Sequence, residues 1–127
     1  MQANYRELKI WKIAMDLVPA IYQVIAALPI EESNNLKDQM RRAATSLPLN
    51  IAEGASSKSM KLYLTHLNYA YASAQELTVA LMLCYKLKYL EEEFFKRIFD
   101  QMDRFNRASY KFILNLEQKE SKEKFDF

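Results

Sequence analysis

The chain contains a single glycine, Gly54, and three prolines among its 127 residues. A strand-rich domain of this size needs many turn residues to reverse the direction of its backbone. The shortage of such residues therefore predicts an all-α protein. No internal repeat or low-complexity tract divides the chain, and at this length we expect one domain around a single core.

Four segments show the three- and four-residue apolar spacing of helices, at residues 5–28, 33–53 (or 35–53), 59–88 and 91–117. Because the connections are short, successive helices run antiparallel, which predicts an up-down-up-down four-helix bundle over residues 1–118. Residues 119–127 are charged and lack an apolar period, so we expect a flexible tail. The expected core stripes are Leu8, Trp11, Met15, Val18, Tyr22 and Ile25; Leu36, Met40, Ala43, Leu47 and Ile51; Met60, Leu64, Leu67, Tyr71, Ala74, Leu77, Leu81 and Tyr85; and Phe94, Ile98, Met102, Phe105, Phe112 and Leu116.

Individual residues mark the expected helix ends and bends. Asn4 and Glu7 have the spacing of a capping box at the start of the first helix. Pro19 predicts a kink in the first helix and Pro48 a bend in the second. Gly54 is expected directly after the second helix, closing its C-terminal end.

Composition narrows the class of protein. Half of the residues are hydrophobic and 27% are charged, which is typical of a globular domain and not of a disordered one. The apolar stretch from Leu77 to Tyr85 is too short to cross a bilayer, and the first residues lack a secretory signal. We therefore expect a cytoplasmic protein without membrane contact. Cys84 is the only cysteine and is expected to be a buried hydrophobe.

A polar stripe accompanies the apolar one within residues 39–54. At about 100° per residue its members fall within roughly 80° on one flank of the helix. If the second and third helices are neighbours, this stripe meets a similar one on the third helix, and their charges compensate one another. The second helix contributes Gln39, Arg42, Ser46, Asn50 and Glu53, and the third contributes His66, Tyr69, Ser73 and Glu76.

Two interpretations of the paired stripes remain open. In the first, the network only sets the register between the two helices. In the second, the same residues border a site for a nucleic acid or a protein partner. The candidate site residues are Arg41, Arg42, Ser46, Asn50, Glu53, Ser73 and Glu76.

The residues offer little for catalysis. His66 is the only histidine, so no histidine pair can hold a metal, and Tyr63 stands where a Glu-x-x-His motif needs glutamate. A single glycine cannot build a glycine-rich phosphate loop, and no serine stands in a pattern with a base. We expect no enzymatic activity, no metal and no cofactor, with His66 as a satisfied polar residue on a helix flank.

The fourth expected helix is apolar over more than one seam of about 100°. Phe95 and Phe99 lie about 100° from the main stripe, and Tyr110 and Ile113 extend the apolar surface further. Either this core-facing stripe is wide, or the surplus is buried between subunits.

The sequence RRAATSLPLNIAEG at 41–54 resembles the signature of the 23S ribosomal RNA intervening-sequence proteins, also described as S23 ribosomal proteins. Residues 8–14, the turn at 29–32 and ASAQEL at 72–77 resemble further motifs of that family. Ala72 stands where the family commonly has glycine, so we expect a slightly looser backbone approach at this point.

This resemblance extends from Tyr5 to about Leu116. It implies an all-α bundle without catalytic activity that assembles as a homo-oligomer, expected to be a pentameric ring. The accessory proteins of diversity-generating retroelements resemble the family in fold and bind nucleic acid and a reverse transcriptase.

Charge leaves the choice of partner open. Eighteen basic and sixteen acidic residues leave a net charge of +2, which attracts phosphates only weakly, although a ring would repeat each basic cluster around its axis. One function is an oligomeric scaffold or adaptor that holds structured RNA, DNA or a nucleic-acid-handling protein; the alternative is a purely structural homo-oligomer without nucleic-acid contact. The basic clusters are Arg6, Lys9 and Lys12; Arg41 and Arg42; Lys58 and Lys61; and Arg97, Arg104, Arg107 and Lys111.

Overall fold

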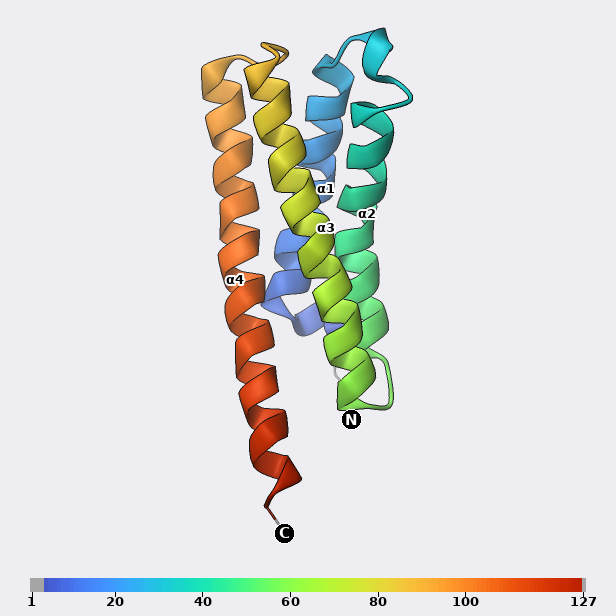
Figure 1. The fold of residues 1–127 in the computed structure, drawn as a ribbon, viewed down its shortest axis with the longest axis vertical. Coiled ribbons are helices and arrows are strands. Elements are labelled where there is room, and N and C mark those ends of the chain that lie inside the picture. The colour runs from blue at the N-terminus through green and yellow to red at the C-terminus, as the bar shows by residue number, and fades with distance from the viewer. Residues whose placement is uncertain (1–3, 127) are drawn as a thin grey trace.

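A computed structural model describes residues 4–126, and in this part of the chain the regular structure is helical (Figure 1). Two short 3-10 turns precede the first and second long helices. The long helices agree in number and approximate position with the four predicted segments. In chain order the elements are η1 Tyr5–Glu7, α1 Lys9–Ala27, η2 Ile30–Glu32, α2 Leu36–Ala55, α3 Met60–Lys86 and α4 Glu92–Lys124.

The four helices form an antiparallel bundle, as predicted. Each helix packs against the next one in the chain, and α4 returns to pack against α1 (Figure 1). Backbone contacts are most numerous between α2 and α3 and sparsest between α1 and α4. The bundle therefore has one tight seam and, next to α1, one loose seam.

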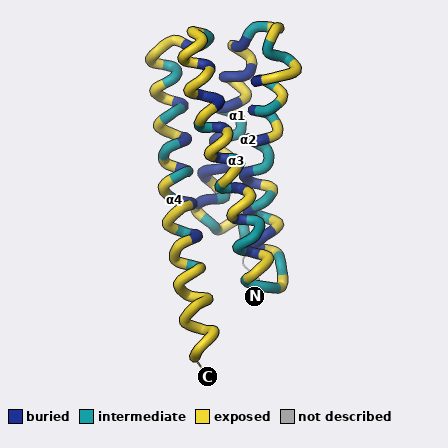
Figure 2. The backbone as a smooth tube through the Cα atoms, in the orientation of Figure 1, coloured by how far each residue is buried: buried dark blue, intermediate teal, exposed yellow. Residues whose placement is uncertain are grey.

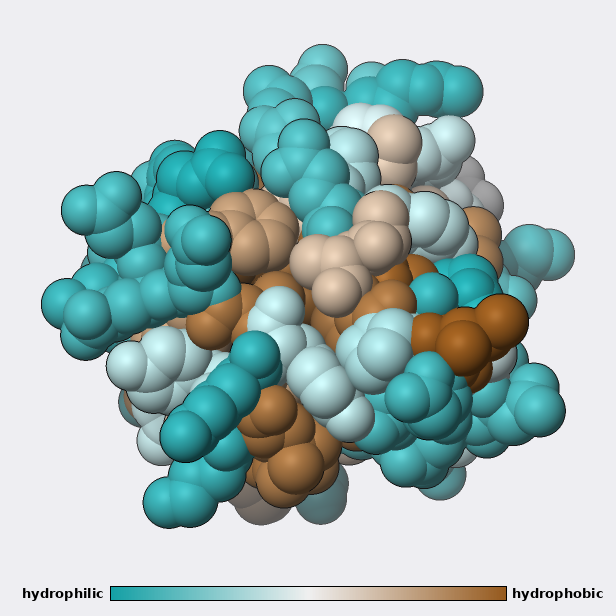
Figure 3. All heavy atoms as spheres, turned by 90° about the horizontal axis from the view of Figure 1, so that it is seen from above, coloured by the Kyte–Doolittle hydropathy of each residue, from teal (hydrophilic) through white to brown (hydrophobic). Residues whose placement is uncertain are grey.

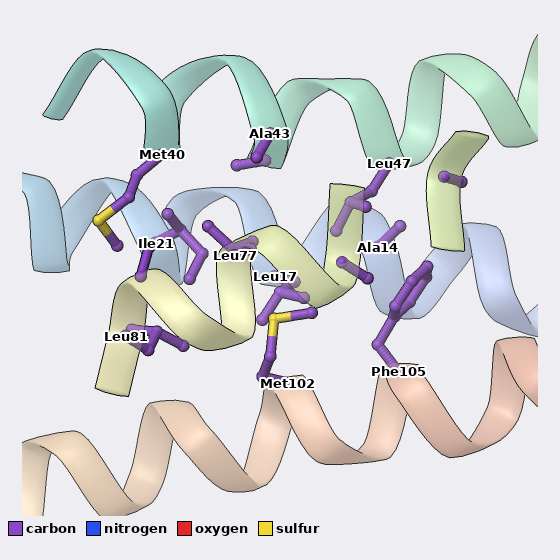
Figure 4. Packing of buried hydrophobic residues seen from close by; sticks show 14 of the residues in the cluster. Ala14, Leu17, Ile21, Met40, Ala43, Leu47, Leu77, Leu81, Met102 and Phe105 are labelled. Atoms are coloured by element: carbon purple, nitrogen blue, oxygen red, sulfur yellow. The ribbon is translucent and has the colours of Figure 1, made fainter. Parts of the chain in front are cut away.

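The core runs along the bundle axis and receives side chains from all four helices (Figure 4). Leu17, Leu47, Leu77 and Phe105 come from different helices and are fully buried. The predicted stripe of α2 is buried at every position. In α3 the prediction is wrong for Tyr85, which is exposed and belongs to the surface of the bundle.

The predicted core face of α1 is wrong at Met15 and Tyr22, whereas Ile25 is buried as predicted. Met15 and Tyr22 were expected inside, yet they are 45% and 42% exposed. The buried face is rotated around the helix and consists of Ile10, Ile13, Ala14, Leu17, Ile21, Val24 and Ile25. This helix is apolar on most sides, so its pattern could not decide which side faces the core.

Several helix boundaries also differ from the predictions. The first helix is divided, because Asn4 caps the short turn η1 through a hydrogen bond from the Arg6 N–H (3.1 Å), and α1 starts only after Leu8. α4 does not end at Glu117 but continues to Lys124, and this last part is exposed on all sides (Figure 2). The predicted tail is therefore largely helical.

Among the described helices, α1 is long and apolar enough to cross a membrane by length and composition, unlike the shorter apolar stretch at residues 77–85. The core helix of a bundle passes the same test. In the bundle the buried side of α1 packs in the common core, which accounts for its apolar composition.

Replacing Leu77 by Ala should lower the free energy of unfolding by ~2 to 5 kcal/mol, because the side chain is fully buried and its loss leaves a cavity. Leu83 lies on the same helix and is 46% exposed, so Leu83→Ala is the matched control and should change stability by less than about 0.5 kcal/mol. Chemical denaturation of both variants measures the difference. Equal losses would mean that the core face of α3 is misassigned.

Candidate functional site

The seam between α2 and α3 is built around Gly54. This residue lies inside α2 with a helical backbone, so the prediction that it closes the helix is wrong. A Cβ atom at this position would lie 2.9 Å from the Cβ of His66 and 3.1 Å from the carbonyl oxygen of Tyr63. Only glycine lets the two helices come this close.

Because the helices are close, short polar side chains can bridge them. The hydroxyl groups of Ser46 and Ser73 are 2.9 Å apart, and the Asn50 Nδ2 group donates to the Ser46 hydroxyl (2.9 Å) and to the Ser46 carbonyl (3.1 Å). On its other side, the Asn50 Oδ1 atom lies 3.0 Å from His66 Nδ1. Ser46, Asn50, Glu53, His66 and Ser73 are called the polar network below.

The hydrogen bonds around Asn50 have assigned donors and acceptors. An amide oxygen only accepts, so His66 Nδ1 carries the proton and donates to Asn50. The carboxylate of Glu53 lies 3.6 Å from the same nitrogen. Ser46 accepts from Asn50, and either hydroxyl can be the donor in its contact with Ser73. The five side chains thus form a continuous series of polar contacts from Ser73 to Glu53.

The structure brings together four of the seven candidate residues, namely Ser46, Asn50, Glu53 and Ser73. Arg42 instead pairs with Asp38 on its own helix (3.5 Å), and both side chains are exposed. The side chains of Arg41 and Glu76 form no ion pair or hydrogen bond recorded for residues 4–126. The Arg41 carbonyl accepts from the Thr45 hydroxyl (3.0 Å).

His66 belongs to the network but was missing from the candidate site. Its spacing from Tyr69 and Ser73 had placed it on the correct flank of α3, where it now lies edge-on to the Tyr69 ring. The expected arginine–carboxylate pair is replaced by contacts of this imidazole. Sequence spacing located the flank but could not show which side chains reach across it.

The α3–α4 seam holds a second polar cluster that sequence reasoning missed. Asn106 Nδ2 donates to the Thr78 hydroxyl (2.9 Å), and Gln75 Nε2 donates to Asn106 Oδ1 (3.2 Å). Near the helix ends, the Tyr89 hydroxyl donates to the Glu32 carboxylate (2.8 Å), a hydrogen bond that raises the pKa of Tyr89. The first two contacts join α3 to α4, and the third joins the segment after α3 to η2.

Two titratable groups of the interior have raised pKa values. Burial raises the pKa of Tyr63 to about 12 and that of Cys84 to about 11, so both are neutral near pH 7. His66 contacts Asn50 and Glu53 but neither Ser46 nor Ser73. Residues 4–126 contain no group of three His, Cys, Asp or Glu side chains that could hold a metal ion.

The surplus apolar surface predicted on α4 is mostly packed within the bundle. The Phe95 ring stacks on Tyr85 with ring centres 4.4 Å apart, Phe99 packs next to Phe95, and Ile113 is buried. Of the four residues Phe95, Phe99, Tyr110 and Ile113, only Tyr110 is exposed.

An exposed apolar surface lies instead on α1 and α2. An open groove of about 480 Å³ runs between these helices and continues along α1 past Tyr22. Leu49, at its edge, is 65% exposed. The side chains called the apolar face below are Met15, Val18, Pro19, Tyr22, Pro48 and Leu49.

Comparison with known proteins agrees with the resemblance seen in the sequence. Residues 6–111 match the family model described as 23S rRNA-intervening sequence protein. The fold is similar to a crystal structure of a protein of unknown function from the S23 ribosomal protein family of Bacteroides thetaiotaomicron, with a TM-score of 0.74 and 22% identity over 82% of this chain and 97% of that chain. No curated protein matches the chain.

Gly54→Ala should destabilise the bundle although alanine favours helices by about 1 kcal/mol. The added methyl group would press on the His66 Cβ atom and on a backbone oxygen, neither of which can turn away, and such overpacking costs ~1 to 3 kcal/mol. Thermal melting compares this variant with Ser56→Ala, an exposed control just after α2. A melting temperature at or above that of the parent would show that the contact at Gly54 does not limit how closely the two helices pack.

Asn50→Ala should cost ~1 to 3 kcal/mol, because it removes the acceptor of His66 and the donor to Ser46 in a partly buried seam. Asn68→Ala is the matched control, since Asn68 is exposed and bonds only to the Leu64 carbonyl of its own helix. Urea denaturation of both variants tests the expectation. If both variants lose the same free energy of unfolding, the hydrogen bonds between α2 and α3 add no more stability than a hydrogen bond within one helix.

Proposed function

Because this chain belongs to the 23S rRNA-intervening sequence protein family, we propose that it is a non-enzymatic scaffold that assembles with copies of itself and holds a nucleic acid. The apolar face of α1 and α2 supports the self-assembly in this proposal. Soluble monomers rarely leave a contiguous apolar surface in water, and burial against a second copy removes it.

The distribution of exposed apolar residues favours a ring over a two-fold dimer. A second set lies on α3 and comprises Leu62, Tyr69, Val79, Met82 and Leu83. α1 and α3 are diagonal in the bundle, so this set and the apolar face lie on different sides. Contacts between two unlike surfaces generate a closed ring when the rotation closes. The family resemblance sets our expectation at five subunits.

The absence of a catalytic role is proposed from the chemistry of the described side chains. The one histidine is occupied by an amide and a carboxylate. The buried thiol of Cys84 and the buried hydroxyl of Tyr63 stay protonated near neutral pH. The polar network therefore serves to set the register of the subunit from which the scaffold is assembled.

The alternative is an assembly protein that contacts no nucleic acid. The near balance of eighteen basic and sixteen acidic residues favours this alternative, since one subunit alone attracts phosphates weakly. Repetition around a ring reverses that argument, because many weak contacts then act together.

The double variant Met15→Glu, Leu49→Glu should dissociate the assembly without unfolding the bundle. Both side chains are exposed in one subunit, so the new charges are costly only where a second copy would cover them. Light scattering should return five times 15.0 kDa for the parent and a single 15.0 kDa chain for the variant.

Ile30→Glu is the control, because Ile30 is exposed at the end of the bundle and does not line the groove of the apolar face. That end shows scattered hydrophobic residues between hydrophilic ones (Figure 3). A parent that remains a 15.0 kDa monomer throughout the micromolar range would refute self-assembly.

A further inference from the structure

Three basic residues of α4 form a straight line on its outer surface. Arg97, Arg104 and Lys111 are seven residues apart, which places them at nearly the same angle around the helix and about 10.5 Å from one another along it. All three are exposed. The line is therefore about 21 Å long.

This line borders the loose seam between α1 and α4. An open groove of about 330 Å³ is lined by Lys9 and Lys111, with Phe112 in its apolar wall and Asn115 at its end. Lys12 lies one turn beyond Lys9 on α1 and is also exposed. Lys9, Lys12, Arg97, Arg104 and Lys111 are called the basic seam.

The members of the basic seam differ from Lys96 and Arg107 of α4, because their charges form no ion pair. Ion pairs elsewhere on the same helix join Lys96 to Glu92 (3.5 Å) and Arg107 to Asp103 (3.1 Å). No ion pair recorded for residues 4–126 includes a member of the basic seam. This holds although several carboxylates are near in sequence or in space.

Those nearby carboxylates reduce the charge of the seam without cancelling it. Glu93 and Asp100 lie one turn before Arg97 and Arg104 on α4. Asp16 lines a small pocket together with Arg104 and is the acidic residue that α1 contributes to the seam. Exposed pairs of this kind are worth little in water, so the guanidinium and ammonium groups remain available to a multivalent anion.

We propose that the basic seam is the surface on which the protein binds the sugar-phosphate backbone of a nucleic acid. This proposal rests on the scaffold function above and identifies where its nucleic acid would lie. A nucleic-acid duplex carries about one phosphate per 1.7 Å of axis, so a line of ~21 Å can meet several phosphates at once. Contacts of this kind position a duplex without reading its sequence.

Self-assembly leaves most of the basic seam accessible. Met15 and Tyr22 of the apolar face lie about 120° to 140° around α1 from Lys9, so a copy docked on that face does not cover Lys9 or the α4 residues of the seam. Lys12 lies about 60° from Met15, at the border of the apolar face. A ring then presents one seam per subunit, which raises the avidity for a long phosphate chain. This multiplies the effect of the modest charge of a single subunit.

The test uses the assembled full-length protein and two fluorescent probes, an RNA hairpin and a DNA duplex of equal stem length. Fluorescence anisotropy measures binding between 50 and 200 mM salt. The seam variant is Arg97→Gln, Arg104→Gln, Lys111→Gln. The control variant Lys119→Gln, Lys122→Gln, Lys124→Gln removes the same charge from the exposed end of the same helix.

We expect the seam variant to bind at least one probe roughly tenfold or more weakly than the parent. The slope of log affinity against log salt should become shallower by about 2 to 3, one unit for each lost phosphate contact. The control variant should stay within about twofold of the parent, because only the seam is positioned to follow the backbone. Light scattering should show the same mass for all three proteins.

Three results would overturn the proposal, and they have different consequences. If the parent binds and the seam variant binds equally well, the seam is wrong while the scaffold function stands. If the parent binds neither probe at 50 mM salt, the nucleic-acid part of the proposed function fails together with the seam. A control variant that loses as much affinity as the seam variant would show that charge, and not position, matters.

Discussion

The close approach of α2 and α3 at Gly54 is the constraint on which the rest of the structure depends. The absence of a side chain at this point brings His66 and Tyr63 against the backbone of α2. Serine and asparagine side chains are short, so the hydrogen bonds from Ser46 to Ser73 and from His66 to Asn50 exist only because the helices are this close. Slippage of one helix along the other would break these bonds together, so the network sets the register.

The apolar face and the basic seam lie outside this contact, between α1 and α2 and between α1 and α4. α1 takes part in both of them, since its inner side fills the core and its outer side carries Met15 and Tyr22 as well as Lys9 and Lys12. A helix that is apolar on most sides can serve the core and a subunit contact together. The sparse contacts between α1 and α4 leave room for the groove beside Lys111.

Particular residues show how far prediction from sequence could go. In α2 the apolar and polar residues separate cleanly around the helix, so the burial of Met40 and Leu47 and the flank of Ser46 and Asn50 were predicted correctly. In α1 the apolar residues are spread around the helix, and the expected burial of Met15 was wrong.

The sequence by itself determined the fold class, the number of helices and the family, because a single glycine and the apolar periods are local properties that need no knowledge of neighbouring helices. Only the tertiary structure decided that Gly54 serves helix packing, that His66 replaces an arginine in the network, and that Arg42 stays on its own helix. Each of these depends on distances between residues far apart in the chain. Periodicity gives the angle of a side chain around its helix, whereas contact also requires the register between helices.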